Sequence, residues 1–204
     1  MSFGEAGGAI GFLVGEENRG LACMFTMMNN ARLAVGVQGV AQAAHATQHA
    51  LAYARERKQG RAPGADKLSS IIEHPDVMRM LLTMTSLTAA ARAICFETAV
   101  SLDRAKRENA PDAARMAEAR ASLLTPVAKA FSSDIANEVA SLGVQVFGGM
   151  GYVEETGDAQ FMRDARICAI YEGTNGVQAM DLVTRKLPLF DGARSEEHTS
   201  ELQS

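Results

Sequence analysis

An acidic residue in the last quarter of the chain stands where a proton-accepting base could lie. Glu172 falls in the run Tyr171-Glu172-Gly173-Thr174, directly after the apolar stretch Ile167 to Ile170. A carboxylate beside apolar residues at a turn is less solvated than one on an open surface, which suits it to acid–base chemistry. Helix-capping acids occur in the same setting, and composition alone favours that second interpretation.

A glycine-rich run, Gly148-Gly149-Met150-Gly151, could be mistaken for a loop that cradles phosphates. A dinucleotide-binding loop should follow a strand and open a helix. This run follows a helical pattern instead, so we interpret it as a helix stop with a tight turn.

The metal-ligating residue types are present but badly spaced for a metal site. His45 and His49 could share one helix face, yet they have no adjacent acid and no third ligand nearby. Cys23, Cys95 and Cys168 are far apart, which argues against a zinc cage or a disulfide framework. We therefore predict no metal, a packed or solvated histidine pair, and a reducing cytoplasmic location.

The spacing of apolar residues predicts helices that would position these groups. A first helix should begin near Gly20 and reach about Lys58, and a loop should occupy residues 60–70. A second helix should follow Pro75, and a third should cover residues 112–147 with a break or kink at Pro126. Two shorter helices are expected at about 159–169 and 174–186. The predicted faces are Leu33, Val37, Val40, Ala44, Thr47 and Leu51 on the first helix, and Val77, Leu81, Met84, Thr88, Ala91, Cys95, Thr98 and Leu102 on the second.

This pattern predicts an all-α fold, an antiparallel four-helix-bundle-like domain over residues 21–187, with a short β remnant at the N-terminus. Residues 1–20 are glycine-rich and contain one short apolar run that is typical of a strand. Residues 188–204 should be a disordered tail, and residues 194–204 look like a translated sequencing adapter.

The charge and hydropathy of the chain exclude some partners. The formal net charge of −4 gives no reason to expect a nucleic-acid surface. No apolar run of about 18 residues could span a membrane, and the first residues do not resemble a signal peptide.

Three ordered motifs resemble the C-terminal domain of acyl-CoA dehydrogenases. They are Gln145-x-Phe147-Gly148-Gly149-x-Gly151-Tyr152, then Arg163-Asp164-Ala165-Arg166-Ile167, then Tyr171-Glu172-Gly173-Thr174-Asn175. The resemblance covers most of residues 8–187. It implies a four-helix-bundle domain of an FAD enzyme that dehydrogenates acyl-CoA thioesters, in a homodimer or homotetramer, with electron-transfer flavoprotein as the electron acceptor.

The resemblance also implies roles for individual residues. Glu172 would be the base that removes the α-proton, and its backbone N–H would bind the thioester oxygen. Some members carry the base at the position of Ala31, which cannot accept a proton. The substrate would contact Asn29, Arg32 and Gly173. FAD would contact Arg57, Lys58, Gln59, His74, Gln145, Val146, Phe147, Gly148, Gly149, Thr174, Asn175 and Gly176.

Details of the sequence resemble one subgroup of this family and lead us to expect that the chain is part of a longer protein. The run Glu73 to Val77, the 60–70 loop and the run Gly173 to Gln178 resemble the methylthiopropanoyl-CoA dehydrogenase-like subgroup. Family members also carry an N-terminal helical domain and a middle β-domain. We therefore expect a fragment of a longer enzyme, with residues 1–20 as the end of that β-domain and little activity or FAD binding alone. A catalytically inactive helical assembly module is the alternative.

Overall fold

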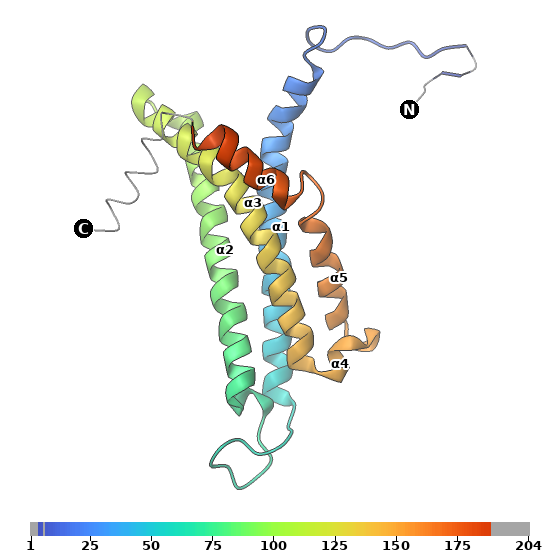
Figure 1. Ribbon diagram of the computed structural model, residues 1–204, viewed down its shortest axis with the longest axis vertical. Helices are drawn as coiled ribbons and strands as arrows, with labels where there is room; N and C mark the ends of the chain where they lie inside the picture. The colour runs from blue at the N-terminus through green and yellow to red at the C-terminus, as the bar shows by residue number, and fades with distance from the viewer. Residues whose placement is uncertain (1–3, 6, 189–204) are drawn as a thin grey trace.

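A computed structural model describes residues 4, 5 and 7–188 of the protein. Within these residues, three long helices lie side by side (Figure 1), each antiparallel to the next along the chain: α1 (Gly20–Glu56), α2 (Pro75–Arg107) and α3 (Pro111–Phe147). Short elements follow: α4 (Gly149–Tyr152), α5 (Asp158–Cys168), α6 (Asn175–Asp181) and a π-helical segment η3 (Leu182–Lys186). The 3-10 turns η1 (Ile71–Glu73) and η2 (Glu154–Thr156) lie in the connections.

The short helix α5 supplies the fourth position of the bundle. It packs against α3 and α1, while α6 crosses α3 near the end of the bundle where α1 begins. The bounds of α2 and α5 agree with the prediction to within about two residues, and the long loop after α1 is present. The predicted all-α, antiparallel bundle is confirmed.

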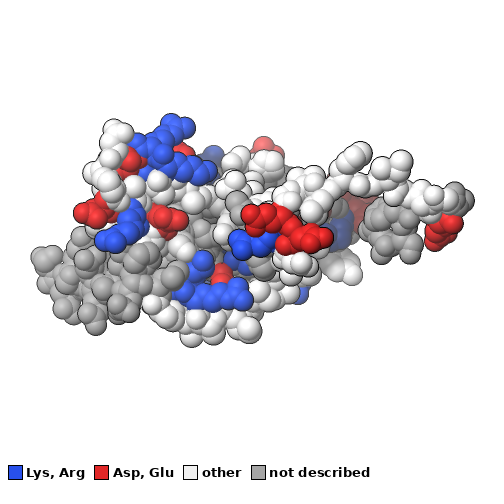
Figure 2. Space-filling view, turned by 90° about the horizontal axis from the view of Figure 1, so that it is seen from above, with Lys and Arg blue, Asp and Glu red and all other residues white. Residues whose placement is uncertain are grey.

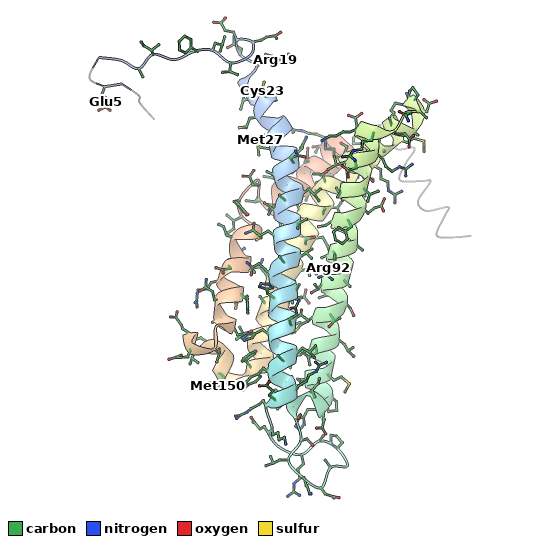
Figure 3. The ribbon with its side chains drawn as sticks, turned by 180° about the vertical axis from the view of Figure 1, so that it is seen from behind. Glu5, Arg19, Cys23, Met27, Arg92 and Met150 are labelled. Carbon is green, nitrogen blue, oxygen red and sulfur yellow. The ribbon has the colours of Figure 1, made fainter. Side chains whose placement is uncertain are left out.

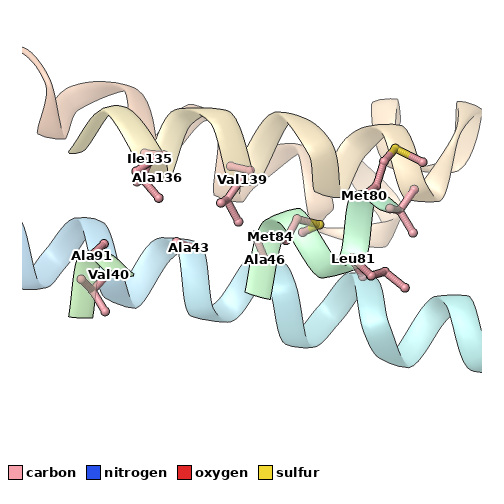
Figure 4. Packing of buried hydrophobic residues seen from close by; sticks show 14 of the residues in the cluster. Val40, Ala43, Ala46, Met80, Leu81, Met84, Ala91, Ile135, Ala136 and Val139 are labelled. Carbon is pink, nitrogen blue, oxygen red and sulfur yellow. The ribbon is translucent and has the colours of Figure 1, made fainter. Parts of the chain in front are cut away.

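The core between the long helices is built largely from small side chains. Ala43 and Ala46 of α1 face Ala136 and Val139 of α3 (Figure 4), and these four residues and Ala50 are fully buried. Small residues at a helix contact let the helix axes approach closely, because no long side chain separates them. On α2, the residues predicted to face the core are buried except at the two ends of the set. On α1, the buried face is rotated from the predicted one, since Val37 is 47% exposed.

Two glycines mark the closest approach of α1 and α3. A Cβ added at Gly36 would lie 2.9 Å from the carbonyl oxygen of Ala128, and one at Gly39 would lie 2.6 Å from that of Ser132. The obstructing atoms belong to backbone and cannot move aside. This contact explains why the buried line on α1 follows glycine and alanine rather than the larger Val37.

Of the break or kink expected at Pro126, the break is wrong. α3 continues through Pro126 without interruption, and the proline ring is fully buried. A proline inside a helix costs about 3 kcal/mol, because its N–H is missing and its ring crowds the preceding turn. Packing of α3 against both α1 and α2 compensates for this cost along the helix.

The predicted β remnant forms no strand among the described residues of the N-terminal segment. Residues 8–14 have no regular structure, and Ile10, Phe12 and Val14 are 91%, 88% and 92% exposed. The segment that carries Glu5 extends away from the bundle (Figure 3). A lone strand has no neighbour for its backbone hydrogen bonds, which is why the apolar run remains unpaired. The predicted adapter-like tail, residues 194–204, lies outside the described residues.

Candidate functional site

Glu172 lies in the tight connection between α5 and α6, in a conformation that is unusual for a residue with a side chain. Its φ is +55°, and the next residue, Gly173, has a φ of +86°. A left-handed conformation costs roughly 1 kcal/mol for a residue with a Cβ, and it persists only where the surroundings enforce it. The Glu172 side chain is half-buried and has no hydrogen-bond partner among the described residues.

The backbone of this turn is held from beneath by a buried amide. Gln178 is fully buried, and its Nε2 donates to the carbonyl oxygens of Glu172 and Gly173 at 3.4 and 3.2 Å. A Cβ at Gly173 would lie 2.8 Å from the same Nε2. Thr174 caps α6 by accepting from the Val177 N–H at 3.4 Å. Gly173, predicted to contact the substrate, and Thr174, predicted to contact FAD, therefore also have structural roles in the turn.

A polar network on α3 binds the start of α6. Asn175 Oδ1 accepts from Lys129 Nζ at 2.9 Å and from Ser133 Oγ at 3.2 Å. Asn175 Nδ2 lies 2.7 Å from Asp134 Oδ1 and donates to it. Both ends of the Asn175 amide are therefore committed to protein groups, although the sequence resemblance assigned this residue to FAD.

Contacts to α1 hold the turn from the other side. The hydroxyl of Tyr171 donates to Gln38 Oε1, and burial raises the pKa of that hydroxyl. Arg32 Nη1 donates to Asp181 Oδ2 at 2.9 Å, in an ion pair whose side chains are 6% and 7% exposed. Arg32, predicted to bind substrate, is thus engaged within the protein. Ala31 lies two turns before Gln38 on the same face of α1, whereas Asn29 is exposed.

A second group of predicted residues meets at the opposite end of the bundle. A pocket of about 390 Å³ lies between the end of α1, the start of α2 and the end of α3. His74 Nε2 lies 2.8 Å from the carbonyl oxygen of Gln59, and Arg57 Nη2 donates to Gln59 Oε1 at 3.5 Å. The Phe147 ring stacks on Tyr53 with centroids 4.0 Å apart. Predicted residues in its lining are Arg57, Gln59, His74, Val146, Phe147 and Gly148.

Three further predicted residues lie beside this pocket without lining it, and one lies elsewhere. Gln145 and Gly149 are exposed at the end of α3, and Lys58 is exposed and forms an isolated β-bridge with Ser70. Gly176 is exposed near the Glu172 turn. The predicted cofactor residues therefore fall into two groups, joined by α5, whose 11 residues span roughly 16 Å.

The histidine pair is a packing feature. His49 contacts the rings of Phe147 and Phe161 at centroid distances of 4.8 and 5.6 Å, and its Nδ1 lies 3.4 Å from Asp158 Oδ1. His45 meets Phe161 edge-on at 6.0 Å. No group of three potential metal ligands occurs in the described part of the chain. His49 is therefore packed and partly buried, whereas His45 is exposed and meets only the edge of one ring.

Sequence reasoning missed three residues at or near these groups: Lys129, Gln178 and Asp158. All three are polar and fully buried. The only available signal was a polar residue on an otherwise apolar helix face, as at Lys129 in the run Val127 to Phe131. Such residues need partners when buried, but the sequence does not say which partners.

Residues 18–187 match the family model described as the acyl-CoA dehydrogenase C-terminal domain. The chain belongs to the acyl-CoA dehydrogenase family. It is 54% identical over 201 residues to 3-methylmercaptopropionyl-CoA dehydrogenase of Ruegeria pomeroyi, an alignment that covers 97% of this chain and 34% of that protein. It is 33% identical to a butyryl-CoA dehydrogenase of Syntrophomonas wolfei, covering 94% of this chain and 33% of the relative.

Several solved structures share the fold of this chain. Butyryl-CoA dehydrogenase of Megasphaera elsdenii superimposes with a TM-score of 0.70 at 31% identity, covering 85% of this chain and 40% of that one. A structure described as electron transferring flavoprotein of Acidaminococcus fermentans matches with a TM-score of 0.69 at 29% identity, covering 87% of this chain and 40% of that one. The chain spans about a third of the length of the curated dehydrogenases it matches.

The surface of this domain carries both signs of charge. On the end of the molecule seen in Figure 2, basic and acidic side chains are interspersed rather than gathered by sign. None of the described helices is long and apolar enough to cross a membrane.

Proposed function

We propose that this chain is the C-terminal helical part of a longer FAD-dependent acyl-CoA dehydrogenase, in which Glu172 removes the α-proton of the thioester substrate. The observation that carries this proposal is the Glu172 turn. A half-buried carboxylate without an internal partner sits at φ +55°, on a backbone that Gln178 holds from beneath. A base needs a free carboxylate in a fixed position, and this turn supplies both.

The chemistry of the reaction explains the need for a positioned base. The α-proton of a thioester is weakly acidic, so its removal needs a poorly hydrated carboxylate and stabilisation of the negative charge that develops on the thioester oxygen. Glu172 would hold the proton on its carboxylate, and its backbone N–H would donate to the thioester oxygen. FAD, when bound, supplies the acceptor for the β-hydride.

The pocket at the other end of the bundle fits the phosphate-bearing half of FAD. The Arg57 guanidinium and the Gln59 side-chain amide offer hydrogen-bond donors around a space of about 390 Å³, and the His74 ring donates from Nε2 to the Gln59 carbonyl oxygen and so holds that segment in place. Guanidinium groups pair well with phosphate oxygens. Gly148, at φ +64°, leaves backbone at the rim open to a ligand.

The two groups of predicted residues support an oligomer. The Glu172 turn and the Arg57 pocket lie at opposite ends of α5. We propose that each serves a different flavin, one bound mainly by this subunit and one by a neighbour, as in a homodimer or homotetramer. We further propose a cytoplasmic enzyme with an electron-transfer flavoprotein as its electron acceptor.

The substrate is proposed to be a short acyl-CoA. The 54% identity to a 3-methylmercaptopropionyl-CoA dehydrogenase supports this class, although the acyl pocket also depends on the other domains. Asn29 is exposed one turn before Arg32 and can reach a ligand. Arg32 is paired with Asp181, so we assign it to joining α1 and α6 rather than to direct binding.

Replacing Glu172 by Gln in the longer enzyme tests the proposal. Gln keeps the size of the side chain but cannot accept the α-proton. FAD content and acyl-CoA binding should be retained, while the rate of dehydrogenation in a stopped-flow experiment should fall by about 10²–10⁴-fold. Adding Ala31→Glu should restore part of the rate, because the facing helix then carries a carboxylate. Near-normal turnover in Glu172→Gln would mean that another residue is the base.

The alternative is a catalytically inactive helical assembly module. It is motivated by the extent of the chain, which covers about a third of its relatives. Flavin absorbance and dye reduction with acyl-CoA by the longer protein distinguish the two. A colourless longer protein without turnover would favour the assembly module.

A further inference from the structure

A lysine lies beneath the Glu172 turn, and the packing of the bundle does not explain its presence there. Lys129 lies in the middle of α3 and its side chain is fully buried. Burial lowers the pKa of Lys129, and the Asp134 carboxylate is the largest opposing influence. Replacing a buried charged group by an apolar residue of similar volume often costs no stability or increases it. Stability of the bundle alone therefore gives no reason for an amine at this position.

Among the described residues, Lys129 makes one hydrogen bond, and it is directed at the start of α6. Lys129 Nζ donates to Asn175 Oδ1 at 2.9 Å, and the opposite end of the same amide donates to Asp134 at 2.7 Å. Lysine can only donate, whereas an ionised aspartate and the Ala130 carbonyl oxygen, 3.3 Å from Asn175 Nδ2, can only accept. Lys129 is therefore the donor on the oxygen side of the amide that fixes its orientation together with these acceptors on the nitrogen side. Ser133 contacts both ends of the amide, at 3.2 and 3.0 Å, and by itself defines neither.

Asn175 in turn determines where the Glu172 turn can lie. Its backbone N–H donates back across the turn to the carbonyl oxygen of Ala169 at 3.4 Å. Only Gly173 and Thr174 separate Asn175 from Glu172, and both Glu172 and Gly173 have a positive φ. A strained turn of this kind relaxes when one anchor is released. Lys129 also lies close enough to interact electrostatically with the Glu172 carboxylate.

We propose that Lys129 is a positioning residue for Glu172, acting through Asn175 to hold the turn in its left-handed conformation. This inference rests on the proposed role of Glu172 as the base. It assigns Asn175 to the support of the turn, in place of the FAD contact that the resemblance implied.

Lys129→Met in the longer enzyme tests the inference, because a positioning role predicts a lower kcat with little change in KM or in stability. A displacement of the base by about 1 Å can cost about 10²-fold, so kcat for a short acyl-CoA should fall by about 10–100-fold. KM should change by less than about threefold, and Tm should stay level or rise because the buried amine is gone. Lys186→Met is the matched control: Lys186 also bonds to α3, at Ser122 (2.9 Å), and its loss should leave kcat unchanged.

Amide hydrogen exchange supplies a readout that is independent of turnover. Exchange of residues 170–178 should become at least about tenfold faster in Lys129→Met, while exchange in α2 stays the same. Should Lys129→Met fold poorly, Asn175→Ala removes the same hydrogen bond and should reproduce the effect on kcat. The double variant should lose no more activity than the worse single variant, because both act through one connection.

Three outcomes would overturn the positioning role: normal kcat in Lys129→Met, unchanged exchange at the turn, or a kcat loss matched by faster exchange throughout the bundle. The last would indicate general destabilisation. A separate experiment tests the proposed function: if Glu172→Gln retained turnover, Glu172 would not be the base, whatever the result for Lys129→Met.

Discussion

At the scale of single residues, this domain holds several polar groups in places where water cannot reach them. Asp158, the first residue of α5, is the clearest case. Its side chain is fully buried, and its Oδ2 has no hydrogen-bond partner in the described structure. Burial raises the pKa of Asp158, and the hydrogen bond from His49 only partly opposes this. His49 in turn packs on Phe147, which lines the Arg57 pocket. Asp158 is therefore linked through His49 to a residue that lines the proposed cofactor site.

Asp158→Asn should stabilise the protein more at high pH than at low pH. A carboxyl whose pKa is raised on folding binds its proton more tightly in the native state. Stability is then greatest below the ordinary range of a carboxyl and falls as pH rises through the raised value. Asn removes this dependence, so its gain in Tm should be on the order of 5 °C at pH 8 and near zero at pH 4. Melting curves at both pH values measure this.

The exposed residue Glu155 provides the control for that experiment. Glu155→Gln removes a carboxylate of the neighbouring turn η2 without changing a buried group, and its Tm should follow the parent at both pH values. A gain in Asp158→Asn that is equal at pH 4 and pH 8 would show that lost charge is not the cause.

At the scale of helices, the site depends on how closely α1 and α3 approach. Lys129 and Ser133 on α3, and Arg32 and Gln38 on α1, all hold the α5–α6 region. Their relative positions follow from the contact at Gly36 and Gly39, where backbone lies against backbone. A change in the spacing of these two helices would therefore move both sets of anchors of the Glu172 turn.

Gly39→Ala should destabilise the bundle by about 1–3 kcal/mol, because the added methyl group would lie 2.6 Å from the Ser132 carbonyl oxygen. This cost outweighs the roughly 1 kcal/mol that Ala gains over Gly in a helix. Urea denaturation gives the difference in unfolding free energy. Gly20→Ala, at the exposed first residue of α1 with nothing within 4 Å, should cost nothing. Equal stability of the two variants would contradict the close approach.

At the scale of the whole molecule, an apolar segment precedes a bundle that it does not contact. Ile10, Phe12 and Val14 are almost fully exposed, and the segment reaches away from the helices. The described part of this chain therefore contains a surface whose burial would need further protein. This agrees with the proposal that residues 1–20 are the end of a β-domain in a longer enzyme.

Replacing Ile10, Phe12 and Val14 together by Ser should affect this chain and the longer enzyme differently. The Tm of this chain should change by less than about 1 °C, because exposed side chains contribute no packing. In the longer enzyme each apolar side chain should be buried, which is worth about 1.5–3 kcal/mol apiece, so Tm should fall by several degrees. Calorimetry of both proteins measures this. A large fall in this chain alone would mean that the segment packs on the bundle.

Much of the fold follows from local features of the sequence. The run of apolar residues spaced for one helix face predicted α2, and Gly148 marked the end of α3. The motif around Glu172 indicated a turn, and the turn has the left-handed conformation that Gly173 makes possible. Periodicity and turn chemistry act between neighbours along the chain, so they can be read without knowing the partners. Pro126 is the exception, since its local preference was outweighed by packing from two other helices.

The partners of the polar residues were decided only by the tertiary structure. Arg32 and Asp181 are 149 positions apart, and Lys129 and Asn175 are 46 apart. Nothing in the local sequence of either member identifies the other. A buried polar group must find a partner, but which one it finds depends on the helix spacing that Gly36 and Gly39 permit. The sequence by itself determined that a carboxylate stands in a glycine-containing turn, and the packing of α1, α3 and α6 determined what holds that turn in place.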